Sequence, residues 1–95
     1  MTIAQIAQTF GTSPKVLERE SLKAYLEKKL NLVSQELFFL QKEYNIKTAK
    51  EFEKAIKSGK IHEFEGKEDN QENFFKFMNL EEERKKILKL FRNIK

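Results

Sequence analysis

Apolar residues recur at helical spacing along most of the chain. The first run is Ile3, Ile6, Ala7 and Phe10. Steps of three and four place such residues on one face of an α-helix. Gly11 comes directly after the run, and a glycine just past a helix supplies the left-handed conformation that ends it. The pattern predicts a short helix over residues 3–10.

A much longer run extends over residues 14–44. Ser13 precedes it as an N-cap, and Pro14 takes the first helical position, where a missing N–H costs nothing. The main seam steps by four and three through Leu22, Leu26, Leu30, Val33, Leu37, Leu40 and Tyr44. A second stripe runs beside it at seven-residue steps, through Tyr25, Leu32 and Phe39. So wide an apolar face predicts neighbours on two sides, as in a bundle or a dimer of hairpins.

A short third helix is expected over residues 48–58. Thr48 with Glu51 three positions later has the pattern of a capping box, and Gly59 ends the run. Residues 59–69 show no sustained period and hold two of the three glycines, which predicts a loop. We expect the loop to be held to the core by its two apolar residues, Ile61 and Phe64.

The last helix is expected over residues 70–94, with Asp69 or Asn70 as its cap. Asn79 followed by Glu82 also has the pattern of a cap, which leaves a break at Asn79 open. Helical spacing continues on both sides of it, through Phe74, Phe77, Met78, Leu80, Ile87, Leu88, Phe91 and Ile94.

These elements predict an all-α protein that forms one domain over residues 1–95, since the length fits a single domain. The order is short, long, short and long helix. We expect the two long helices to pack antiparallel, as a hairpin or a small bundle. A chain this short buries a modest core, and dimerisation increases the buried surface. We therefore expect a homodimer.

The composition limits the kinds of chemical site that the chain can form. The chain has no cysteine, so neither a disulfide nor a thiolate site is available. His62 is the only histidine and lies in an acidic stretch, "HEFEGKED", which we interpret as a solvated loop; a metal site would need its carboxylates to converge. We expect no catalysis, no cofactor and no metal. The chain has no apolar run of about 20 residues and no signal-peptide pattern, so we expect a cytoplasmic protein outside the membrane.

The N-terminal corner raises a DNA-binding hypothesis. Ala7, Gly11 and Leu17 stand where a helix-turn-helix has a small residue, a turn glycine and a buried aliphatic residue. Glu20, however, stands where that motif is apolar. The helix that begins near Pro14 also continues far beyond the length of a recognition helix. We interpret the stretch as a helical corner held together by its caps.

The same stretch, "IAQIAQTFGTSPKVLERESLKAYLEKKL", resembles the two helices of ribbon–helix–helix antitoxins and repressors of the Arc and MetJ class. A short helix ends at a glycine, and a serine-capped helix follows. The resemblance implies dimerisation through this corner. Only Met1 and Thr2 precede the first helix, so the strand with which that family reads DNA has no counterpart. The rest of the chain, including "EYNIKTAKEFEKAIKSGKI", resembles small prokaryotic antitoxin-like proteins.

Two pairs of adjacent phenylalanines are the candidate binding residues: Phe38 with Phe39, and Phe74 with Phe75. Neighbours in a helix point about 100° apart, so one face cannot bury both members of a pair. We expect a second copy or a partner protein such as a toxin to cover the rest. The function predicted is a protein–protein interaction module, with the antitoxin role implied by the resemblance. The alternative is weak nucleic-acid binding without sequence specificity, through Lys15, Arg19, Lys23, Lys89 and Arg92.

Overall fold

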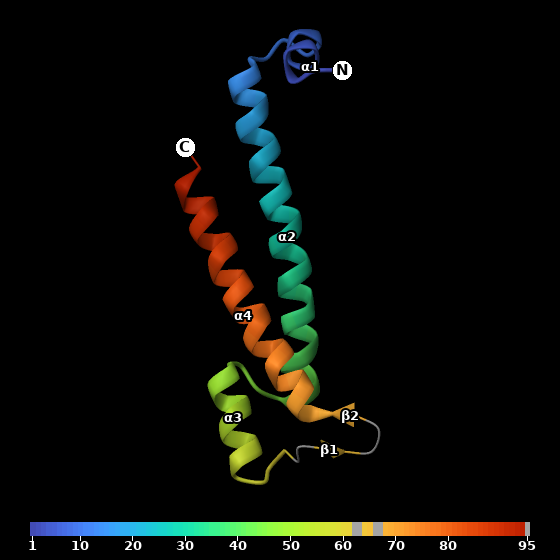
Figure 1. The fold of residues 1–95 in the computed structure, drawn as a ribbon, viewed down its shortest axis with the longest axis vertical. Coiled ribbons are helices and arrows are strands. Elements are labelled where there is room, and N and C mark those ends of the chain that lie inside the picture. The colour runs from blue at the N-terminus through green and yellow to red at the C-terminus, as the bar shows by residue number, and fades with distance from the viewer. Residues whose placement is uncertain (62–63, 66–67, 95) are drawn as a thin grey trace.

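In the computed structural model, which describes residues 1–61, 64–65 and 68–94, the chain folds almost entirely into helices (Figure 1). The helices are α1 (Ile3–Thr9), α2 (Pro14–Tyr44), α3 (Ala49–Lys57) and α4 (Asn70–Asn93), and the strands are β1 (Phe64–Glu65) and β2 (Glu68–Asp69). Each helix boundary lies within one residue of the predicted one. The all-α class and the order of short and long helices are confirmed.

The long helices α2 and α4 run antiparallel along each other and form the predicted hairpin (Figure 1). The helix α3 packs on the first part of α4, and α1 folds back against the start of α2 at the opposite tip. We call these two tips the α3 end and the α1 end. The molecule is elongated, with principal extents of 60 × 25 × 16 Å.

The corner between α1 and α2 is built from local hydrogen bonds. Gly11 has φ +69°, and the Thr12 N–H donates to the Ala7 carbonyl at 2.8 Å while the Gly11 N–H donates to Gln8. This is the Schellman arrangement of a helix C-terminus. The Ser13 hydroxyl then accepts from the Val16 N–H at 3.1 Å and starts α2. Both the glycine stop and the serine cap are therefore confirmed.

The turn between α2 and α3 uses a left-handed residue and a modified capping box. Asn45 has φ +54°, and asparagine tolerates this conformation better than most residues. The Thr48 hydroxyl accepts from the Glu51 N–H at 3.2 Å, as predicted. The Glu51 carboxylate accepts from the Lys47 N–H at 2.6 Å, one residue before the cap, because the turn at Asn45 brings that N–H within its reach.

Two expectations for the C-terminal part need correction. Within the predicted loop over residues 59–69, β1 and β2 pair antiparallel, with Phe64 opposite Asp69; strands of two residues are too short to leave an alternating pattern. The alternative of a break at Asn79, which the sequence left open, is excluded, because α4 is continuous there and buries side chains on both sides of that position. Ile61 packs against the core as expected, while the side chains of His62 and Phe64 lie outside the described part of the chain.

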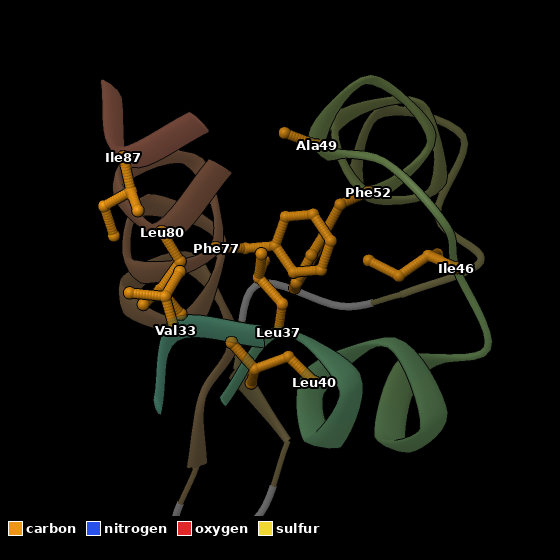
Figure 2. Packing of buried hydrophobic residues seen from close by; sticks show 9 residues of the cluster. All are labelled: Val33, Leu37, Leu40, Ile46, Ala49, Phe52, Phe77, Leu80 and Ile87. Atoms are coloured by element: carbon orange, nitrogen blue, oxygen red, sulfur yellow. The ribbon is translucent and has the colours of Figure 1, made fainter. Parts of the chain in front are cut away.

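The core lies toward the α3 end, where α2, α3 and α4 meet. Its buried members are Val33, Leu37, Leu40, Ile46, Ala49, Phe52, Phe77, Leu80 and Ile87. Figure 2 shows Phe52 from α3 and Phe77 from α4 meeting at the centre of this cluster, and their ring centroids are 6.0 Å apart in an edge-on contact. Both rings are fully buried. In α2 the buried residues begin only at Val33, so the half of the hairpin near the α1 end has almost no core.

One buried polar cluster joins the end of α2 to the start of α4. Asn70 is completely buried, and its side-chain oxygen accepts a hydrogen bond from the Tyr44 hydroxyl at 2.5 Å. The Asn73 side-chain amide donates to the same hydroxyl at 2.7 Å. Asn70 was expected as a possible cap of the last helix. It is instead the first residue of α4, and its side chain turns inward to Tyr44.

Candidate protein-binding grooves

Three of the four predicted binding phenylalanines are exposed, and one is not. The exposed fractions are 56% for Phe38, 70% for Phe39 and 48% for Phe75. Phe74 is half-buried and packs against the core, with its ring edge-on to Phe52 at 5.6 Å. Phe74 therefore belongs with the core, because α3 brings Phe52 against that side of α4.

Phe38 and Phe39 lie on opposite flanks of the buried seam of α2. Phe38 follows the buried Leu37 and Phe39 precedes the buried Leu40. A step of one residue is a rotation of about 100°, so the two rings point to different sides of the hairpin. Each ring lines its own groove between α2 and α4, and the two rings also line a third, apolar hollow on α2.

The first groove, which we call the acidic groove, lies between Phe39 of α2 and Phe75 of α4. Four carboxylates line it, from Glu36, Glu43, Glu72 and Glu83, and Lys76 is the cation among its lining residues. Phe39 and Phe75 come from different helices and are 36 positions apart in the sequence. The hairpin brings these two predicted binding residues to one surface.

The second groove, which we call the basic groove, lies on the other flank, where α3 joins α2 and α4. Phe38 and Met78 are its exposed apolar residues, and the cations that line it are Lys47, Lys50, Arg84 and Lys85. The Lys42 ammonium sits 4.9 Å from the centroid of the Phe38 ring, within cation–π range. Sequence reasoning missed Met78 as a binding residue, because its spacing in α4 also fits the core face.

Two carboxylates line the basic groove and both are engaged within the protein. Glu53 pairs with Lys57 at 2.8 Å, one helical turn away in α3. The hydrogen bond from Lys57 and its positive charge lower the pKa of Glu53, so this carboxyl stays ionised at neutral pH. The Glu81 carboxylate accepts from the Ala49 N–H at 3.2 Å at the start of α3. The groove therefore presents cations to a ligand more than it presents anions.

The cations predicted for nucleic-acid binding lie mainly at the α1 end. Lys15 and Arg19 line a hollow there with Asn93, the last residue of α4, and with Ile94, which follows it. Glu18 lines the same hollow and offsets part of their charge. Arg92 lies beside an apolar hollow formed by Leu30, Leu88 and Phe91. Lys23 and Lys89 are exposed and line neither hollow, so the five predicted cations do not line a single hollow.

Among the residues that the structure describes, no group of three or more His, Cys, Asp or Glu side chains is arranged to hold a metal ion. The side chains of the acidic stretch around His62 lie outside the described part of the chain. In the same described part of the chain, no helix combines the length and the apolar character that crossing a bilayer requires.

Comparisons with known proteins place the chain in a family. No curated protein matches it, and no solved structure does. A family model, in contrast, matches residues 1–95, the full length of the chain. The chain therefore belongs to the Uncharacterized protein MJ0235 family.

Proposed function

We propose that the protein is a non-catalytic interaction module that binds an acidic amphipathic segment of a partner protein in its basic groove. The observation that carries this proposal is the exposed Phe38 ring at the edge of a groove framed by cations from α3, α4 and the turn before α3. An exposed aromatic residue beside a preformed groove is the usual anchor of a protein interface.

The apolar part of the groove suits a helical ligand. Phe38 and Met78 are both exposed, and they come from the two long helices that form the walls. An amphipathic helix lays its apolar face into such a groove. Methionine adapts its shape to irregular ligand side chains because it is unbranched and polarisable.

The charges around the groove select the partner. Lys47 and Lys50 lie at and just before the start of α3, and Arg84 and Lys85 lie on α4. All four are exposed, so they attract a negatively charged segment and accelerate its association. They also disfavour a basic segment by charge repulsion. The selected ligand is apolar on one side and rich in Asp and Glu on its rim.

The groove is preorganised. Leu37 and Ala49, which also line it, belong to the buried core, so its floor is the packed part of the molecule. A rigid site loses little conformational entropy when the partner binds. The antitoxin-like role, which rests on the resemblance noted in the sequence, would use this binding to mask a partner's active surface.

A matched pair of substitutions tests the site. Phe38→Ala should weaken partner binding by about tenfold or more, because truncation of an aromatic hot spot typically costs about 2 kcal/mol or more. Phe75→Ala is the control, since Phe75 is similarly exposed but lines the acidic groove. The measurement is calorimetric titration with the product of the neighbouring gene, preceded by thermal melts that show both variants folded.

A second arm tests the charge selection. Lys50→Glu with Lys85→Glu should weaken binding further and reduce its dependence on salt. Equal losses for Phe38→Ala and Phe75→Ala, or no binding by the intact protein, would contradict the proposed site. The antitoxin role requires in addition that the neighbouring gene arrests growth when expressed alone and that co-expression relieves the arrest.

A further inference from the structure

Apolar residues of α2 continue into a half of the hairpin that has almost no buried core. Leu22 and Leu32 in α2 are 51% and 53% exposed, and Leu90 near the end of α4 is 53% exposed. The two helices also diverge toward the α1 end (Figure 1). A helical segment without tertiary packing is marginal in water, so this part of the molecule needs a cover.

The size of the uncovered surface fits a second protein chain. A compact monomer of 11.3 kDa exposes roughly 5,700 Å², whereas this chain exposes 7712 Å². Its radius of gyration is 19.3 Å, against about 12 Å for a compact domain of this length. The excess of roughly 2,000 Å² is larger than the ~800 Å² that one partner contributes to a standard interface.

The outer stripe of α2 has a pattern that can pair with itself. Tyr25, Leu32 and Phe39 are all exposed, and steps of seven residues keep them on one side of the helix. The stripe has an aromatic residue at each end and Leu32 at its centre. Its flanking charges change sign along the helix, with Lys28 and Lys29 before Leu32 and with Glu36 and Glu43 after it.

We propose that a second copy of this chain covers the stripe, with the two α2 helices antiparallel across a two-fold axis at Leu32. In this register Leu32 meets the partner's Leu32, and Tyr25 meets the partner's Phe39. Lys28 meets the partner's Glu36, and the same pair recurs on the other side of the axis, as two-fold symmetry requires. A parallel arrangement would set Glu36 against the partner's Glu36 and Lys28 against the partner's Lys28.

The acidic groove supports the same arrangement. It opens on the flank of α2 that carries Phe39, so the antiparallel register sets its carboxylates opposite the lysine-bearing half of the partner's α2. In α4, Leu90 lies seven residues after Glu83, on the side of the helix that faces this groove. Leu90 thereby extends the apolar surface toward the α1 end. The basic groove lies on the other flank and stays open in both copies.

Sedimentation equilibrium of the full chain over a wide concentration range tests the interface. The expected mass is twice the 11.3 kDa of one chain. Leu32→Glu should raise the dissociation constant at least about tenfold, because it sets two carboxylates together at the axis. Met78→Glu is the control, since Met78 is exposed but lies on α4 at the basic groove. A monomer at all concentrations, or dissociation by both variants alike, overturns the proposal.

A charge exchange tests the register. Lys28→Glu and Glu36→Lys should each weaken the dimer, and the double variant should restore it, because the antiparallel register re-forms both pairs with reversed signs. Failure of the double variant to restore the dimer overturns the antiparallel arrangement.

The chain has no cysteine, so Leu32→Cys provides a test that does not depend on how the charged variants fold. Under oxidation the Leu32→Cys variant should form a disulfide-linked dimer, and the Met78→Cys variant should stay monomeric on a denaturing gel. A linked Met78→Cys variant with an unlinked Leu32→Cys variant overturns the proposal.

Discussion

Tyr44 is the residue on which the junction of the two long helices depends. Its hydroxyl donates to the buried Asn70 and accepts from Asn73, and its ring contacts that of Phe52 in a tilted arrangement, with 4.5 Å between the centroids. One side chain thus joins α2, α3 and α4. A buried polar group is costly when it loses a hydrogen-bond partner, so the hydroxyl matters beyond the packing of the ring.

We therefore predict that Tyr44→Phe lowers the free energy of unfolding by about 1–3 kcal/mol, since it removes a donor from the buried Asn70 while keeping the ring. The control is Tyr25→Phe, because Tyr25 is the other tyrosine of the chain and is exposed. Urea denaturation of both variants, followed by circular dichroism at one fixed protein concentration, gives the comparison. Equal stability of the two variants would mean that the hydroxyl of Tyr44 contributes nothing.

Among the elements, the turn after α2 decides where the core lies. Asn45 takes a left-handed conformation, and the Ile46 N–H donates back to the Gln41 carbonyl at 3.0 Å. Ile46 is thereby carried directly into the core. The turn fixes the direction from which α3 approaches, and α3 in turn delivers Phe52.

This turn gives the second prediction. Asn45→Ala should cost about 1 kcal/mol or more of stability, because a side chain with a Cβ but no local hydrogen-bonding group is strained at positive φ. Asn45→Gly should leave stability unchanged or raise it, since glycine adopts this conformation freely. Thermal melts of the two variants decide the point. A more stable Asn45→Ala than Asn45→Gly would exclude a left-handed residue here.

Across the whole molecule, the core is concentrated at one end. Phe52 and Phe77 are fully buried near the α3 end, whereas the buried residue of the α1 end is Ala7, in the corner between α1 and α2. The hairpin is therefore rigid at one tip and depends on further contacts at the other. The basic groove occupies the rigid part, and the outer stripe extends into the weaker part.

We predict that the uneven distribution of buried contacts along α2 is visible in amide hydrogen exchange. In the Leu32→Glu variant, which is expected to be monomeric, amides of α2 over residues 17–30 should exchange much faster than those over residues 34–44, because few buried contacts hold the first segment. In the wild-type protein at high concentration the difference should shrink as the second copy covers the stripe. Uniform protection along α2 in the monomeric variant would contradict the uneven core.

The helices could be predicted from the sequence because the signals that define them act over a few residues. Ser13 and Thr48 cap their helices by bonding to N–H groups three residues later, and Gly11 ends α1 through its own backbone conformation. The apolar period then identifies the inward faces, since each helix buries only one side. The exposure of Phe38, Phe39 and Phe75 follows from the same geometry, because one helix face cannot bury two adjacent residues.

Only the tertiary structure decided which neighbouring aromatic residue is buried. Phe74 and Phe75 have the same local environment in the sequence, yet Phe74 packs on Phe52 while Phe75 is exposed. The choice depends on α3, which reaches α4 from one side through the turn at Asn45. The separation of charge into an acidic and a basic groove has the same origin, because each groove combines residues from helices far apart in the chain. Spacing along one helix determines which residues share a face, whereas the packing of the other helices determines which face is covered.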